Sequence, residues 1–144
     1  MELLKVADVP ATTVTKETTV IEAINAMVKN RVGAVAVVDR DYLQGIFTER
    51  DVMIRVVQAR RNPEATRISE VMTVAVQTAS ADTSVHQALS QMIEQHVRHL
   101  PIIDGNGRIL GMLSIRHLLQ HRVENLSHEL EAVDAYLTAD GIGG

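Results

Sequence analysis

The feature that most constrains this chain is an internal repeat. Residues 14–53 align with residues 79–119, and the match runs through a predicted helix, a strand, a turn and a second strand. The offset is 65 residues up to the pair Asp39 and Asp104, and 66 after the turn, where the second copy is one residue longer. Chance is a poor explanation for a match of this length, so we expect two copies of one structural unit.

The sequence pattern of each copy predicts the order strand, helix, strand, strand, helix. An extended segment, PATTV or AVQT, leads into Thr, Ser and Asp residues suited to capping a helix. An amphipathic helix follows, and then an apolar run, AVAVVD or LPIID, that is typical of a buried strand. After a turn with Asp or with Gly-Asn-Gly comes a strand, QGIFT or LGMLS, and a second helix is expected to begin at Glu49 or Ile115.

One such unit is too small to cover both faces of its sheet, whereas two copies packed sheet against sheet can do so. The predicted fold class is therefore α+β, an α/β sandwich of two repeats with approximate two-fold symmetry. Equivalent loops of the two copies would then surround shared clefts. We divide the chain into a first repeat with the N-terminal segment and linker (1–65), a second repeat (66–122) and a C-terminal helical extension (123–144).

Composition excludes several classes of protein. The net charge of -4 and the presence of only three aromatic residues argue against binding to nucleic acid. Without cysteine the chain has no disulfide, thiol nucleophile or zinc-thiolate site. No apolar run approaches membrane-spanning length and no signal peptide is readable, so we expect a cytoplasmic protein without a membrane partner.

Three stretches carry a resemblance to a known family: VMTVAVQTASADTSVHQAL, VRHLPIIDGNGRILGMLS and GIFTERD. Together they resemble the tandem cystathionine-β-synthase (CBS) domain pair, or Bateman module, over roughly residues 6–120. GIFTERD and the long C-terminal helix are similar to the small stand-alone CBS-pair proteins of bacteria. The resemblance implies an adenosine nucleotide (AMP, ADP or ATP) bound between the repeats, a disc-like homodimer, and regulation of a partner protein rather than catalysis.

Thr48 and Asp51 lie where a strand is expected to end and a helix to begin. The local interpretation is a helix N-cap, with acidic residues favoured by the helix dipole. The resemblance implies that Asp51 accepts hydrogen bonds from both ribose hydroxyls, for which a carboxylate has two oxygens. It also implies that Thr48 and Arg50 lie near the phosphates. The two interpretations are compatible, because a cap would fix the carboxylate.

Arg98 and His99 match a basic pair that family members direct at nucleotide phosphates, whereas the corresponding Gly33 and Ala34 have no such reach. The alternative for the basic pair is a solvated strand edge. The small residues would instead give a base room to lie against the backbone. The expected nucleotide site comprises Thr13, Val32, Gly33, Ala34, Ala36, Thr48, Glu49, Arg50, Asp51, Arg98, His99 and Pro101.

In the second copy His117 takes the place of Asp51, and an imidazole cannot accept from two hydroxyls. We therefore expect a second, weaker cleft formed by Thr78, Ser114, Arg116 and His117, which could still favour an anion.

His117 and His121 share a helix face by their spacing, but no cysteine accompanies them and no metal site is predicted. No cofactor is expected, and no arrangement typical of an enzyme is readable.

The C-terminal segment carries a heptad pattern. From Leu119 to Leu137 apolar residues follow one another at spacings of 4, 3, 4, 3 and 4 (Leu119, Val123, Leu126, Leu130, Val133 and Leu137). This pattern predicts a long helix that either packs on its own domain or reaches a second subunit and secures a homodimer. ADGIGG is expected to end it. A structural adaptor that dimerises and leaves its clefts empty is the alternative function.

Overall fold

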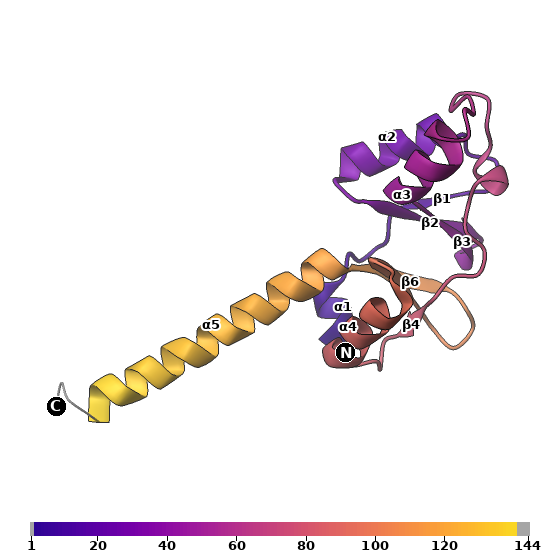
Figure 1. The fold of residues 1–144 in the computed structure, drawn as a ribbon. Coiled ribbons are helices and arrows are strands. Elements are labelled where there is room, and N and C mark those ends of the chain that lie inside the picture. The colour runs from indigo at the N-terminus through magenta and orange to yellow at the C-terminus, as the bar shows by residue number, and fades with distance from the viewer. Residues whose placement is uncertain (1, 141–144) are drawn as a thin grey trace.

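The computed structural model describes residues 2–140 and confirms the predicted α+β fold. Figure 1 shows two small α/β units stacked on each other, with one long helix projecting away from them. The elements are α1 (Glu2–Val6), β1 (Thr13–Val14), α2 (Val20–Asn30), β2 (Ala34–Asp39), β3 (Tyr42–Thr48), α3 (Glu49–Asp51), β4 (Ala79–Ser80), α4 (Val85–Gln95), β5 (His99–Ile103), β6 (Ile109–Ser114) and α5 (Ile115–Asp140). A π-helical turn over Val52–Val57 continues α3, and a 3-10 turn spans Ile68–Glu70.

The described residues form two three-stranded sheets, ordered β1-β2-β3 and β4-β5-β6. In each sheet the first pair of strands is parallel and the second is antiparallel. The predicted extended segment AVQT is corrected, because pairing in the second sheet begins only at Ala79 and residues 75–78 carry no strand. The helices α2 and α4 begin where predicted, since the hydroxyls of Thr19 and Ser84 cap them.

Alternation along β2 explains why the sheets stack. Val35 and Val37 face α2 and belong to the core of the first repeat. Ala34, Ala36 and Val38 face the other way, into a cluster that also contains Ile46 and Met112 and lies between the sheets. Both faces of β2 are therefore buried, one by a helix and one by the second sheet.

The hydrophobic cores do not divide at residue 65, where the sequence predicts the boundary between the repeats. The core of the first repeat includes Ile68 and Val71, which follow the linker. The core of the second repeat includes Leu3 from α1, packed with Leu100 and Leu118. The segment that precedes each repeat thus packs on the other repeat.

Close backbone contacts at two glycines hold these crossing segments in place. Thr73 exchanges two backbone hydrogen bonds of 2.9 Å with β3, and Asp8 exchanges two of 2.9 and 3.0 Å with β6. A Cβ atom on Gly45 would lie 2.7 Å from the carbonyl oxygen of Thr73, and one on Gly111 would lie 2.9 Å from that of Asp8. The glycines that the two copies share therefore permit this approach.

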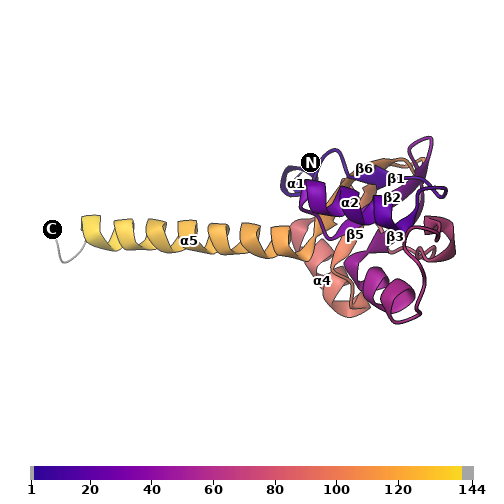
Figure 2. The same cartoon turned by 90° about the horizontal axis from the view of Figure 1, so that it is seen from above.

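The helix α5 extends from the second repeat into solvent (Figures 1 and 2). The six residues of its heptad seam, from Leu119 to Leu137, are 43–70% exposed, so the alternative that the seam packs on its own domain is wrong. The helix reaches Asp140, and the remainder of the predicted ADGIGG end lies outside the described residues. None of the helices within residues 2–140 is long and apolar enough to cross a membrane.

Candidate functional site

Clefts at the junction of the repeats are lined by equivalent residues of the two copies. The first, here called the Asp51 cleft, has a volume of about 750 Å³ and is lined by Ile46, Thr48, Glu49, Arg50, Asp51, Met53, Ile54, Thr73, Ala75, Val76, Gln77, His96, Val97, Arg98 and His99. The second, the His117 cleft, has a volume of about 600 Å³ and is lined by Asp8, Ile24, Met27, Val28, Arg31, Val32, Gly33, Ala34, Glu49, Val52, Arg98, His99, Met112, Ser114, Ile115, Arg116 and His117. Each combines a helix start from one repeat with a strand start from the other.

A capping box fixes the carboxylate of Asp51 at the start of α3. The backbone N–H of Thr48 donates to Oδ2 of Asp51 over 3.0 Å, and the hydroxyl of Thr48 donates to the same oxygen over 3.2 Å. In return the N–H of Asp51 donates to that hydroxyl over 3.2 Å. The predicted cap is confirmed, and it holds the carboxylate in one orientation with its side chain 13% exposed.

The other oxygen of Asp51 has longer contacts. The hydroxyl of Thr73 donates to Oδ1 over 3.4 Å, and Nε of Arg55 lies 3.6 Å from it. Arg55 is itself held by the carbonyl oxygens of Val71 and Met72, at 3.2 and 2.9 Å. Because both contacts to Oδ1 are long, this oxygen is the better placed of the two to accept hydrogen bonds from a ligand.

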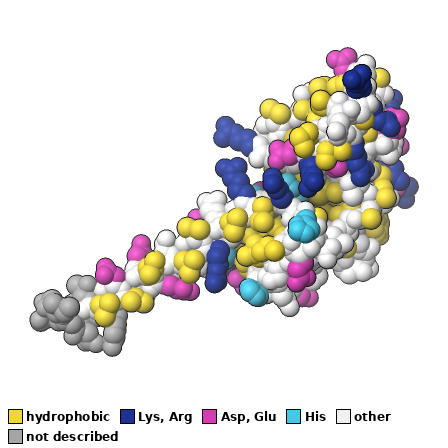
Figure 3. Space-filling view, in the orientation of Figure 1, with side chains coloured by type: hydrophobic (Ala, Val, Ile, Leu, Met, Phe, Trp, Pro, Cys, Tyr) yellow, Lys and Arg dark blue, Asp and Glu magenta, His cyan; other side chains and the backbone are white. Residues whose placement is uncertain are grey.

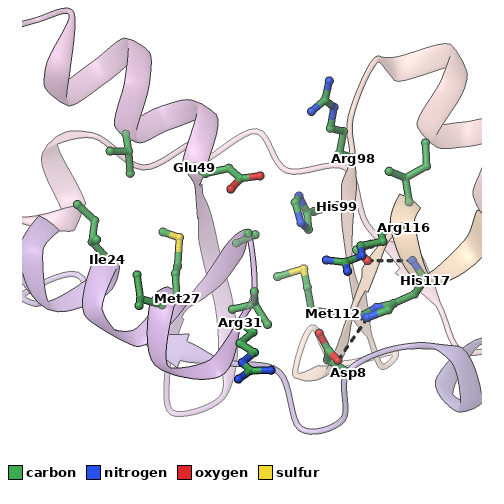
Figure 4. Close-up of a pocket in the computed structure, with 17 residues that line it drawn as sticks. Asp8, Ile24, Met27, Arg31, Glu49, Arg98, His99, Met112, Arg116 and His117 are labelled. Carbon is green, nitrogen blue, oxygen red and sulfur yellow. Dashed lines mark hydrogen bonds and ion pairs between the residues drawn. The ribbon is translucent and has the colours of Figure 1, made fainter. Parts of the chain in front are cut away.

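His117 occupies the equivalent position in the other cleft and keeps only part of this arrangement. Its backbone N–H donates to the hydroxyl of Ser114 over 3.2 Å, and its Nε2 lies 4.0 Å from Oδ1 of Asp8. Within the described residues its buried Nδ1 has no hydrogen-bond partner. The cap is thus retained, but a ring that faces a carboxylate replaces the acceptor (Figure 4).

Three residues, Glu49, Arg98 and His99, line both clefts and form the wall between them. Glu49 and His99 face each other across the junction in Figure 4. A Cβ atom on Gly33 would lie 3.0 Å from Oε1 of Glu49 and 3.3 Å from Cε1 of His99, so a larger residue there would crowd the wall. Burial lowers the pKa of His99 below its ordinary value of 6.5; the carboxylate of Glu49 opposes this shift and the charge of Arg98 adds to it. The ring is therefore neutral at pH 7.

The structure brings part of the predicted nucleotide site together. Six of its residues line the Asp51 cleft: Thr48, Glu49, Arg50, Asp51, Arg98 and His99. Val32, Gly33 and Ala34 instead line the His117 cleft, which corrects their grouping with Asp51. The reason is the approximate two-fold arrangement, in which the start of β2 faces the start of α5 and the start of β5 faces α3.

Four predicted residues line neither of these clefts. Ala36 lies buried between the sheets, and Pro101 is buried in β5 opposite Met112. Thr13 is exposed on β1, and Thr78 lies just before β4. Of the predicted second cleft, Ser114, Arg116 and His117 do lie together.

Several residues that line the clefts were missed from the sequence. Asp8 and Thr73 are equivalent at an offset of 65, and so are Arg31 and His96, which both end a helix in the left-handed conformation. Extending the repeat alignment to residue 8 would have found the first pair. No group of three or more Asp, Glu or His side chains within residues 2–140 is arranged to hold a metal ion.

Comparisons with solved structures agree with this architecture. A CBS-domain protein from Burkholderia ambifaria is 36% identical with a TM-score of 0.79, and the alignment covers 85% of this chain and 92% of that one. A CBS-domain protein from Pyrobaculum aerophilum, solved in complex with AMP, is 24% identical with a TM-score of 0.73 over 80% of this chain and 88% of the other. At that identity the second likeness shows the fold alone.

Sequence relatives are longer proteins. The Schizosaccharomyces pombe meiotically up-regulated gene 70 protein is 38% identical over 117 residues, which are 81% of this chain and 16% of the relative. The mitochondrial CBS domain-containing protein CBSX3 of Arabidopsis thaliana is 32% identical over 128 residues, or 85% of this chain and 62% of the relative. The chain thus spans less than two thirds of the length of each.

The family model of the CBS domain matches residues 6–58 and again residues 68–124. These segments carry the two sheets and the helix starts that line both clefts. The chain therefore belongs to the CBS-domain family and contains a tandem pair of CBS domains.

Proposed function

We propose that this chain is a regulatory module that binds an adenosine nucleotide in the Asp51 cleft and passes its occupancy to a partner protein. The observation that carries the proposal is the carboxylate of Asp51, fixed by Thr48 with its Oδ1 held only by long contacts. Oδ1 can accept from one ribose hydroxyl directly, and Oδ2 can accept from the other once the hydroxyl of Thr48, which donates to it over 3.2 Å, turns away. A lone helix cap would need no such cleft beside it.

Other features of the Asp51 cleft suit the remaining parts of a nucleotide. Its volume of about 750 Å³ lies within the range of small-molecule sites. Met53, Ile54 and Val76 offer apolar surface for a base. Arg50 and Arg98 supply the charge for phosphates. CBS pairs with adenosine ligands lend support: the Pyrobaculum protein was solved with AMP, and protein MJ0100 with 5′-methylthioadenosine and S-adenosyl-L-methionine.

The composition of the cleft also suggests how binding is reported. The first repeat contributes Thr48 to Asp51, and the second contributes His96 to His99. A ligand that contacts both groups favours the relative position of the repeats that satisfies both. Because α5 is continuous with β6 of the second repeat, such a shift would move α5 relative to the first repeat.

Thermal unfolding with a panel of ligands tests the proposal. The panel contains AMP, ADP, ATP, NAD, S-adenosylmethionine and cyclic dinucleotides, with guanosine and cytidine nucleotides as matched controls. A ligand at a hundredfold excess over its dissociation constant should stabilise the protein by about 2.7 kcal/mol. A panel in which no adenosine compound raises the melting temperature would contradict the proposal and favour the adaptor.

The exposed seam of α5 favours a second role, and we propose that it joins two copies of the chain in a homodimer. Its apolar residues recur at heptad spacing along one side of a helix that projects into solvent. Figure 3 shows hydrophobic side chains along α5 with acidic side chains beside them. Burial of Leu126 and Leu130 against the same residues of a second copy would remove this apolar surface from water.

The substitutions Leu126→Asp and Leu130→Asp together should split the dimer, because they would bury charge in its contact. Ala132→Asp with Ala135→Asp is the matched control, since both are exposed and lie off the seam. Sedimentation velocity measures the outcome. A monomeric wild type, or an equal effect of both double variants, would overturn the dimer.

A further inference from the structure

The His117 cleft differs from the Asp51 cleft in its charge. Three arginines line it against two carboxylates, whereas two arginines face two carboxylates in the Asp51 cleft. The charged residues of the His117 cleft are Arg31, Arg98, Arg116, Asp8 and Glu49. Arg31 and Arg116 lie on opposite sides of the cleft in Figure 4, one at the end of α2 and the other at the start of α5. In Figure 3, Lys and Arg side chains gather beside histidine at the junction of the repeats.

Arg31 ends α2 in a left-handed conformation, with φ of 56°. This conformation is unfavourable for a residue with a Cβ atom, and helices usually place Gly or Asn there. The equivalent residue, His96, has the same φ of 56° and lines the other cleft. The conformation therefore places a long basic side chain at one cleft and an imidazole at the other.

Below these charges the His117 cleft has an apolar floor. It is built by side chains from α2, from the turn after α3 and from the second repeat, among them Ile24, Met27, Val52, Met112 and Ile115. Such a floor would gain from covering by an apolar group, but it offers no hydrogen bonds to a sugar. Where a ribose would need the carboxylate, His117 stands beside Asp8.

We propose that the His117 cleft binds a small organic anion that has an apolar body and no ribose. Arg31 and Arg116 hold its phosphate or carboxylate group, since the guanidinium fork suits either. The alkyl part lies on the floor near Met27 and Ile115. This site does not depend on nucleotide binding in the Asp51 cleft, although both share Arg98.

Titration followed by amide NMR shifts of isotope-labelled protein tests the proposal with four probes that separate the charge from the apolar body. Hexyl phosphate and hexanoate carry both the charge and the apolar body, inorganic phosphate carries only the charge, and hexanol carries only the body. Either six-carbon anion should move the amide signals of Gly33 and His117, with an affinity at least about tenfold above both controls. The stronger of the two anions identifies the acidic group. Equal shifts from hexanol, or shifts confined to the Asp51 cleft, would overturn the proposal.

The repeat supplies a matched pair of variants. Arg31→Asn removes the charge and keeps a residue that tolerates the left-handed conformation, so the fold is preserved. It should weaken the anionic probe about tenfold while leaving the affinity for AMP unchanged. His96→Asn, the same change at the equivalent position, should leave probe binding unchanged. Equal loss in both variants, or no loss in Arg31→Asn, would contradict the site, whether or not AMP binds.

Discussion

The Asp51 cleft and the His117 cleft are built from equivalent elements of the two repeats and differ in their side chains. Each is formed by a capped helix start, a strand start and a crossing segment, related by the repeat. The cap itself survives in both, through Thr48 or Ser114. The position of the carboxylate differs between the clefts. It lies at the helix start, at Asp51, in one cleft and on the crossing segment, at Asp8, in the other. One scaffold can therefore offer sites of different chemistry.

The largest expected effect separates the two clefts directly. Asp51→Ala removes the acceptor for both ribose hydroxyls and should weaken AMP binding on the order of a hundredfold, because hydrogen bonds to a charged group are each worth about 1.5–3 kcal/mol. His117→Ala should change AMP binding little. Isothermal calorimetry measures both.

Asp51 also caps α3, so a loss of folding has to be distinguished from a loss of acceptor. Asp51→Asn keeps one carbonyl oxygen for the cap and should fall between the wild type and the alanine variant. Wild-type affinity in Asp51→Ala, or two equal sites per wild-type chain, would remove the distinction between the clefts.

The next effect is a gain of binding. His117→Asp combined with Asp8→Thr gives the His117 cleft the same pair that Asp51 and Thr73 form, and AMP should then bind there as well. His117→Asp alone should gain little, because Asp8 already lies 4.0 Å from the ring and two carboxylates would repel. Calorimetric stoichiometry decides the outcome. An unchanged stoichiometry in the double variant would show that the distinction needs more than these residues.

A smaller effect is expected at the wall that the clefts share. Arg98→Ala should weaken ATP about tenfold and adenosine much less, because only the phosphates need the guanidinium. The loss should shrink as salt rises. Affinities measured at two salt concentrations test both statements. Equal losses for ATP and adenosine would exclude a phosphate contact by Arg98.

The smallest effect concerns His99. Its pKa is lowered by burial, so below its unfolded value of 6.5 the unfolded chain binds more protons than the folded chain. The free energy of unfolding should therefore fall as the pH drops below about 6.5, by at most about 1.4 kcal/mol per pH unit from this group, until the folded pKa is passed. Denaturation at several pH values should show that the free energy of unfolding falls less steeply with decreasing pH in His99→Gln than in the wild type. Identical slopes would contradict this assignment.

The sequence alone determined the features that depend on local chemistry. The repeat, the helix starts at Val20, Val85 and Ile115 and the cap at Asp51 all follow from residues a few positions apart. Hydrophobic periodicity and capping act within a turn or two of helix, so they can be read along the chain. The heptad pattern does not decide whether the seam packs on its own domain or on a second subunit, because it does not specify a partner.

Only the tertiary structure decided which residues share a cleft. It placed Gly33 and Ala34 beside His117 rather than Asp51, and it brought Asp8 and Arg31 into the same site. It also packed α1 on the second repeat. These contacts join segments far apart in the chain. Because the two repeats have nearly the same apolar pattern, that pattern is compatible with Gly33 lying beside either Asp51 or His117. The choice depends on how the two sheets stack and on where the connecting segments cross, which no local pattern encodes.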